Sequence, residues 1–198
     1  MPEQPLDPQQ LETLRQAIAS GDPARAMPAL AGLREVAPEQ AIPLLLLGLQ
    51  QETFMIRSLS CAGLGYKQSE QGWQALVAAL QQDDDPNVRA EAAKALVSYS
   101  LERSQPLLLE AFAANGHWLV RCSILSAVAE LVDVPAGWLL DLARLAIADA
   151  DGTVRVGGAE ILGRLVAEGS AEARVLLVPL QSDSDHRVVA AALNGLQV

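Results

Sequence analysis

Apolar and polar residues follow one another in this chain with the period of an α-helix, in segments separated by short polar turns. Trp73, Leu76 and Leu80 have the spacing i, i+3, i+7, which places their side chains on one helical face. The polar stretch 81–85 ends this pattern, and a second apolar face follows over residues 88–99. The sequence therefore predicts a pair of helices joined by a turn.

This pair of helices recurs at a nearly constant interval, which one residue type makes visible. An arginine stands at a fixed place in each interval, with successive spacings of 32, 32, 32, 34 and 32 residues. A period this regular predicts a repeat protein in which each helix pair buries its apolar face against its neighbours. The arginines that mark the interval are Arg25, Arg57, Arg89, Arg121, Arg155 and Arg187.

The repeats account for nearly the whole chain and predict an all-α protein of about twelve helices. We expect residues 1–8 to be a flexible N-terminus and residues 9–198 to form a single repeat domain. Pro28 falls where the second helix of the first repeat should be under way, so that helix is either kinked or begins later. Two extra residues near 133–137 predict a longer loop between the fourth and fifth repeats.

The second helix of the third repeat carries the most specific pattern in the chain. Its sequence DPNVRAEAAKAL, residues 85–96, follows D-x-x-V-R-x-x-A-x-x-A-L. It resembles the HEAT-like repeat of the phycobilisome-lyase group, over roughly residues 9–198. That group includes two-subunit phycobilin lyases, phycobilisome-degradation proteins and cyanobacterial HEAT proteins that interact with an A-type iron–sulfur scaffold. Residues 54–68 and 117–131 look most like the last two kinds.

The resemblance implies a fold and a range of functions. The expected fold is an α-solenoid of about six HEAT-like helix pairs. The expected function is that of a non-catalytic protein-binding adaptor or chaperone, whose client is a phycobiliprotein or an iron–sulfur scaffold protein. The alternative is a subunit of a phycobilin lyase that attaches or removes a bilin on a phycobiliprotein.

Charge and hydropathy narrow the range of partners. The chain has a net charge of −10 and a sequence pI of about 4.6, and its 14 lysines and arginines are dispersed. Nucleic acid and anionic membranes both require clustered basic residues, so neither is an expected partner. The sequence lacks a run of 18 apolar residues and a basic, apolar leader. We therefore expect no membrane insertion and a cytoplasmic protein.

The reactive residue types are too few and too far apart for a catalytic or metal centre. His117 and His186 are the only histidines, and Cys61 and Cys122 the only cysteines. The two cysteines are two repeats apart on predicted second helices, among small residues, so we expect them to pack rather than react. The sequence thus predicts no catalytic residue, metal site or cofactor, and an enzyme only if the lyase alternative holds.

Apolar residues at outward positions indicate a docking surface. In the third repeat the outward positions of the second helix carry Asn87, Glu91, Lys94 and Ser98, whereas the second and fourth repeats carry apolar side chains at several of these offsets. Exposed aromatic and Met side chains often anchor protein interfaces. The alternative is that they cover a neighbouring repeat. The predicted partner-binding residues are Phe54, Met55, Leu59, Tyr66, Trp118 and Leu119.

The arginine ladder has a structural and a functional interpretation. We expect each arginine to reach the inter-helix turn of an adjacent repeat, where carbonyls or acids such as Asp85 and Asp151 would accept its hydrogen bonds. The alternative is a stripe that binds anions. The acidic turns themselves either cap helices or form a rim for a basic partner. The predicted structural ladder is Arg57, Arg89, Arg121, Arg155 and Arg187.

The last repeat suggests a second kind of contact. It ends on Leu193, Leu196 and Val198 without a polar capping helix, and solenoid ends that leave an apolar face uncovered tend to associate. We therefore expect that this protein can self-associate through its C-terminal repeat.

Overall fold

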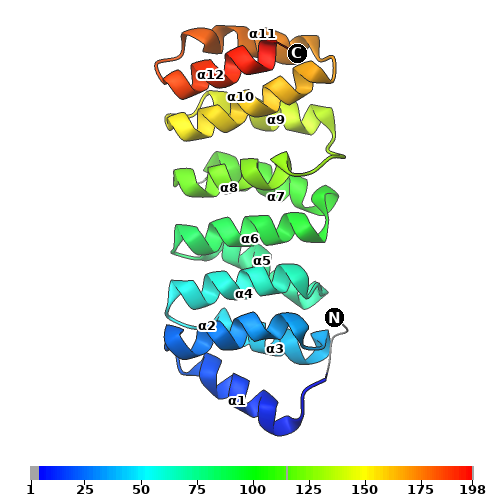
Figure 1. Ribbon diagram of the computed structural model, residues 1–198, viewed down its shortest axis with the longest axis vertical. Coiled ribbons are helices and arrows are strands. Elements are labelled where there is room, and N and C mark those ends of the chain that lie inside the picture. The colour runs from blue at the N-terminus through cyan, green and yellow to red at the C-terminus, as the bar shows by residue number, and fades with distance from the viewer. Residues whose placement is uncertain (1–4, 115, 198) are drawn as a thin grey trace. The chain divides into compact units, whose positions relative to one another are not determined.

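The computed structural model of the chain describes residues 5–114 and 116–197, and within them every regular element is a helix. Residues 1–4 of the predicted flexible N-terminus lie outside the described part, and the first helix begins at Pro8. Six successive helix pairs pack as repeats (Figure 1). The prediction of an all-α solenoid is thereby confirmed.

Within residues 5–114 and 116–197, twelve α-helices and two short 3-10 helices make up these pairs. Their bounds are α1 Pro8–Ala19, α2 Pro23–Gly32, η1 Leu33–Glu35, α3 Pro38–Gly48, α4 Phe54–Tyr66, α5 Glu70–Gln82, α6 Pro86–Tyr99, α7 Leu101–Ala114, α8 Trp118–Ala129, α9 Ala136–Ile147, α10 Gly152–Ala167, α11 Ala171–Leu177, η2 Val178–Ser182 and α12 His186–Leu196.

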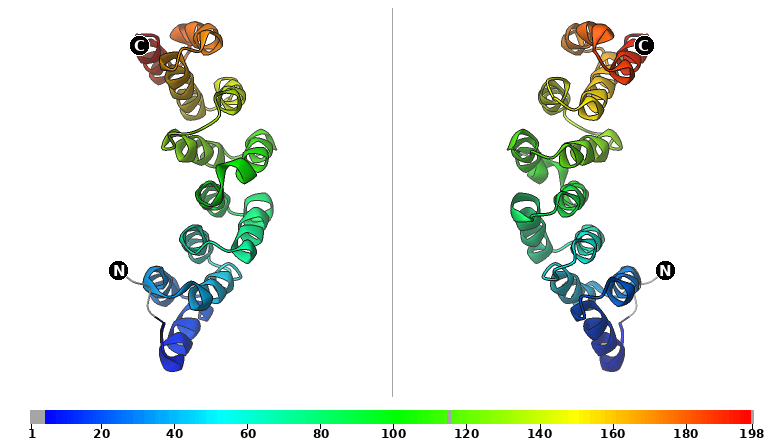
Figure 2. Two further views of the ribbon diagram at one scale, coloured as in Figure 1. Left: turned by 90° about the vertical axis from the view of Figure 1, so that its right-hand side faces the viewer. Right: turned by 90° about the vertical axis from the view of Figure 1, so that its left-hand side faces the viewer.

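The chain divides into two compact units, Met1–Ser104 and Gln105–Val198, with the boundary inside α7. In the first unit the second helices α2, α4 and α6 form one row, while α1, α3 and α5 form the other (Figure 2). In the second unit α10 packs between α8 and α12 and against α9. Each second helix is therefore the element that joins one repeat to the next within its unit.

Aspartates cap the second helices α2, α6, α10 and α12 and order the polar turns before them. Asp85 accepts a hydrogen bond from the amide of Asn87, and Asp151 accepts from the amides of Thr153 and Val154. These bonds satisfy amides that have no partner within the helix. In the first repeat α2 begins at Pro23 and continues through Pro28. The second helix of this repeat therefore does not begin after Pro28, which was one of the two expected arrangements.

Small residues allow neighbouring second helices to approach closely. A Cβ atom built on Gly163 of α10 would lie 2.9 Å from the Cα atom of Gly195 in α12, and one built on Gly195 would lie 2.7 Å from the Cα atom of Gly163. In the first unit a Cβ on Gly65 of α4 would lie 3.2 Å from the Cβ of Ala95 in α6. The contact between α10 and α12 is thus one of backbone on backbone.

Candidate functional site

The arginine ladder links the turn of one repeat to the turn of the next. Nε and Nη2 of Arg57 donate to the two carboxylate oxygens of Asp83 at 2.8 and 2.9 Å. Nη1 of the same arginine donates to the carbonyl oxygens of Gln51 at 3.0 Å and Glu52 at 2.6 Å. One guanidinium therefore closes its own turn and holds an aspartate 26 residues further along the chain.

The same geometry recurs twice in the second unit. Arg155 donates to both carboxylate oxygens of Asp183, at 2.9 and 2.8 Å, and to the carbonyl oxygens of Asp149 and Ala150. Arg121 makes the corresponding two bonds to Asp149. The charged side chains of these pairs are only 8 to 16% exposed. Charged pairs this far removed from water support a structural role for the arginines.

The acid of each pair differs from the acids that the sequence suggested. Asp83 and Asp149 bond the arginines, whereas Asp85 and Asp151 cap the following helices. One carboxylate oxygen of Asp83 also accepts from the amide of Asp85 at 2.9 Å. The first aspartate of a turn thus bonds the arginine of the preceding repeat, and the second caps the helix that follows in its own repeat.

Arg89 holds its own turn in the same way as Arg57. Its Nη1 donates to the carbonyl oxygens of Asp83 at 2.6 Å and Asp84 at 3.1 Å. Its Nε is buried and has no hydrogen-bond partner in the part of the chain that the structure describes. The position that carries an aspartate in other repeats is Asn115 here, which lies outside the described residues.

Arg187 does not occupy the register of the other arginines. It is the second residue of α12, whereas Arg155 is the fourth residue of α10. Its side chain folds back on the capping carboxylate of Asp185, with Nη2 at 2.7 Å from Oδ2, and Nη1 approaches the hydroxyl of Thr153. The position equivalent to Arg155 is therefore Val189, because this repeat is two residues longer than the arginine spacing implied.

Hydrogen bonding in the ladder lowers the pKa of two aspartates, Asp83 and Asp183. Burial alone would raise the pKa of Asp83, but the bonds from Arg57 and from the Asp85 amide outweigh it and hold the pKa below its ordinary value of 3.8. The bonds from Arg155 lower the pKa of Asp183 in the same way. Both aspartates are therefore held as carboxylates in the folded state.

These shifts predict that the protein loses stability in acid. A carboxyl with a lower pKa in the folded than in the unfolded state stabilises the fold above the unfolded pKa, and this stability is lost as the pH falls through the folded pKa. We expect the urea midpoint to decrease below pH 4 or so, in the range where carboxyls of ordinary pKa take up protons. An Asp83→Asn, Asp183→Asn variant should start lower and show a shallower decline. An equal decline in both proteins would contradict this assignment.

The predicted docking residues of the first unit lie on α4, and most of them are exposed. Phe54 is 38%, Met55 39% and Tyr66 65% exposed, whereas Leu59 is half-buried. At the same offsets α6 carries Asn87, Glu91, Lys94 and Ser98, none of which is a large apolar side chain. The α4 helix therefore presents an apolar row where α6 presents a polar one.

A pocket of about 210 Å³ adjoins this row, between α4 and the preceding second helix α2. Leu59 and Tyr66 line it from α4, and Leu30 and Leu33 line it from the first repeat. The guanidinium of Arg34 lies over the Tyr66 ring at 4.7 Å from its centroid, a cation–π contact that holds the ring beside the pocket. The sequence did not reveal this pocket.

A buried lysine completes the wall of this pocket. The side chain of Lys67 is almost fully buried, and its ammonium donates to the carbonyl oxygen of Arg34 at 2.8 Å. Burial of an ammonium requires acceptors that replace water. Lys67 thus ties the end of α4 to η1 and closes the pocket on that side.

The other two predicted docking residues, Trp118 and Leu119, belong to the second unit and are not part of the α4 row. Trp118 begins α8, is 44% exposed and stacks on the imidazole of His117. Leu119 is half-buried, and its amide donates to Nδ1 of His117 at 3.3 Å. His117 therefore caps α8 in the place where other repeats use an aspartate.

Cys61 and Cys122 lie in surroundings that disfavour a thiolate. Burial raises the pKa of the fully buried Cys61 to about 12, and it also raises the pKa of the half-buried Cys122. Across residues 5–114 and 116–197, no three His, Cys, Asp or Glu side chains are grouped to hold a metal ion. In the same residues no helix combines the length and apolar character needed to cross a membrane.

Comparison with known proteins identifies the repeats and the fold. Residues 42–129 match the HEAT repeats family. The crystal structure of an engineered protein superposes with a TM-score of 0.55 at 16% identity, covering 94% of this chain and 95% of the other. At this identity the likeness concerns the fold alone. The chain thus contains HEAT-like repeats.

Two further comparisons add no functional assignment. Human deoxyhypusine hydroxylase in complex with glycerol gives a TM-score of 0.42 at 16% identity, with 96% and 95% of the two chains covered. No curated protein matches the chain. The narrower resemblance to the phycobilisome-lyase group stays a prediction.

Proposed function

We propose that this protein is a non-catalytic adaptor or chaperone that binds another protein through the α4 row and its pocket. HEAT repeats commonly serve as scaffolds for protein interactions. The observation that supports this use of α4 is the pocket between α2 and α4, which Tyr66 lines while remaining 65% exposed, on the same helix as the exposed Met55. A pocket beside exposed anchor residues is the usual setting of an interface hot spot.

The pocket suits a single apolar side chain of a partner. Its volume of about 210 Å³ is smaller than that of typical small-molecule sites. Its walls are mostly leucine and alanine, and Tyr66 can bury a large rigid area on binding at little entropic cost. The proposed client, from the resemblance, is a phycobiliprotein or an A-type iron–sulfur scaffold protein.

The rival function, a phycobilin lyase subunit, draws support from the two cations at the same pocket. A bilin carries propionates and favours arginine or lysine beside an apolar groove. Here, however, the ammonium of Lys67 donates to the carbonyl oxygen of Arg34, and the Arg34 guanidinium stacks on Tyr66. The pocket also has room for a side chain rather than for four linked pyrrole rings. We therefore favour the adaptor, and a coloured protein after co-expression with bilin-making enzymes would favour the lyase.

Self-association through the last repeat remains part of the proposal. In that repeat Val175 is 70%, Val178 49% and Leu193 44% exposed. Leu196 is half-buried, and Val198 lies outside the described residues. These apolar side chains support an additional contact with a second copy of the chain.

The adaptor proposal predicts that loss of the α4 anchors weakens client binding without unfolding the protein. We expect Met55→Ala combined with Tyr66→Ala to weaken binding at least tenfold, about 1.4 kcal/mol. Binding would be measured by titration with a purified phycobiliprotein and with an A-type iron–sulfur scaffold protein. The thermal midpoint should change little, since exposed side chains contribute little to the core.

The chain offers a matched control for this experiment. Asn87→Ala combined with Ser98→Ala changes the same two offsets on α6, where the row is polar. This variant should bind as the wild type does. If the α4 variant also binds undiminished, the docking surface lies elsewhere, and if neither client binds the wild type, the proposed client is wrong.

A further inference from the structure

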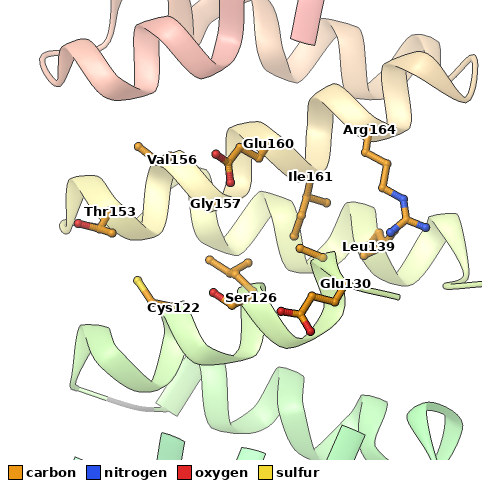
Figure 3. A pocket seen from close by; sticks show the side chains of 12 residues that line it. Cys122, Ser126, Glu130, Leu139, Thr153, Val156, Gly157, Glu160, Ile161 and Arg164 are labelled. Atoms are coloured by element: carbon orange, nitrogen blue, oxygen red, sulfur yellow. The ribbon is translucent and has the colours of Figure 1, made fainter. Parts of the chain in front are cut away.

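The second unit contains a larger groove, of about 470 Å³, between α8 and α10. Two rows of residues line it, Cys122, Ser126 and the C-cap Glu130 along α8 and Thr153, Glu160 and Arg164 along α10 (Figure 3). The residues from Cys122 to Glu130 span about 12 Å of helix axis. The groove is thus long enough for about two turns of a helix.

The floor of the groove is apolar. Leu125 of α8 and Ile161 of α10 are almost fully buried and contribute their exposed edges, and Val156 is half-buried. Gly157 allows Leu125 to lie against the α10 backbone, because a Cβ atom there would be 2.9 Å from a Leu125 methyl. The helices therefore touch at this point and leave the groove open beside it.

One end of the groove is held by Arg164. Its Nη1 and Nη2 donate to the carbonyl oxygens of Leu131 and Val132, both at 2.6 Å, and its Nε donates to Glu168 at 3.0 Å. These bonds fix the loop after α8, which contains the extra residues of this repeat. All three nitrogens of the guanidinium already have acceptors, so the positive charge of Arg164 is committed to the protein itself.

The carboxylates of the groove are not committed in this way. Glu130 and Glu160 are both exposed, and within the described residues neither carboxylate has an ion pair or a hydrogen bond. Glu130 follows the last residue of α8 and Glu160 lies on α10, so the two stand on opposite sides of the groove (Figure 3). An occupant should therefore carry positive charge on both sides of an apolar stripe.

We propose that this groove binds a basic amphipathic helix of a protein partner. Such a helix would place apolar side chains at i, i+3 and i+4 on Leu125 and Ile161, as helix-in-groove complexes do. Lysine or arginine on either flank would meet Glu130 and Glu160. The net charge of −10 would attract such a segment over a distance. This site is separate from the α4 pocket and does not depend on it.

Two synthetic helical peptides test the proposal. They share one leucine stripe and differ only in their flanks, which carry lysine in one peptide and glutamate in the other. We expect the lysine peptide to bind the full chain at least tenfold more tightly by fluorescence anisotropy. Its affinity should fall as salt is raised, because exposed charges are screened. Equal binding of both peptides, or no binding of the lysine peptide, would overturn the proposal.

Variants of the chain locate the binding. Ser126 is exposed in the groove, so Ser126→Trp should fill it and weaken the lysine peptide at least tenfold. Glu130→Gln combined with Glu160→Gln should reduce the preference for lysine. The control, Glu110→Gln combined with Glu172→Gln, removes the same charge from exposed positions outside the groove and should leave the preference unchanged. If the control has the same effect, the preference reflects overall charge and the groove assignment fails.

Two further outcomes distinguish the groove from the α4 surface and from a contact between copies of the chain. The Met55→Ala, Tyr66→Ala variant should bind the lysine peptide as the wild type does. Loss of binding in that variant would place the peptide on α4 instead of in the groove. If Ser126→Trp converts a wild-type dimer to a monomer while neither peptide binds, the occupant is a second copy of the chain and the proposal is wrong.

Discussion

Replacing Arg57 with alanine should lower the free energy of unfolding by about 3 kcal/mol, near the lower bound for breaking a buried ion pair. The substitution leaves the carboxylate of Asp83, only 11% exposed, without its guanidinium. It also removes the donor that two turn carbonyls share. Urea unfolding followed by far-ultraviolet circular dichroism measures the loss.

Arg89→Ala is the matched control for that experiment. Arg89 bonds two carbonyls of its own turn, as Arg57 does, but the structure shows no carboxylate on it among the described residues. We expect a loss of about 1–2 kcal/mol, which corresponds to the turn bonds alone. The difference between the two variants then gives the contribution of the aspartate. If both variants lose the same free energy of unfolding, the Arg57–Asp83 ion pair contributes nothing to stability. That result would favour the alternative interpretation of the arginines as an anion-binding stripe.

Replacing Gly163 with alanine should destabilise the second unit by about 1–2 kcal/mol. Alanine favours a helix over glycine by about 0.5–1 kcal/mol. Here, however, its methyl group would lie 2.9 Å from the Cα atom of Gly195, and a backbone cannot turn aside as a side chain can. The helices α10 and α12 must separate, at a cost of about 1–3 kcal/mol for an overpacked contact. The thermal midpoint should fall accordingly.

Gly137→Ala provides the comparison. Gly137 lies near the start of α9, is exposed, and a Cβ atom there would have no heavy atom within 4 Å. The helical preference of alanine should therefore act alone and raise stability by about 0.5 kcal/mol. Equal stabilisation by both substitutions would show that α10 and α12 separate at little cost and that the glycine contact does not fix their distance.

The sequence predicted the repeats well because helical periodicity and capping aspartates are local signals. The ladder was predicted less completely. Asp83 and Asp85 lie in one turn, and spacing alone does not tell which carboxylate meets Arg57. Arg187 was placed with the ladder because it lies 32 residues after Arg155, although Asp149 and Asp183, like Val154 and Val188, are 34 residues apart. That second interval was the signal that could have shown the shift in register.

The α4 pocket and the groove between α8 and α10 could not be predicted, because both depend on how repeats of different length fit together. Pro28 obscured the helical phase of the first repeat, so the contribution of Leu30 and Leu33 to the α4 pocket was hidden. The groove on α8 and α10 depends on Arg164 holding the loop beyond Glu130, a contact between residues 33 positions apart. Neither arrangement follows from a local pattern.

The ladder also bears on how such a protein can change its length in evolution. Each ion pair of the ladder needs one arginine and one aspartate. Residues 149–182 contain one of each, Asp149 and Arg155. A tandem duplication of this stretch would set the copied aspartate beside the original Arg155 and the copied arginine beside Asp183. Recombination between repeats can thus add a repeat whose arginine and aspartate already have partners in the neighbouring repeats, before any selection on the new junction.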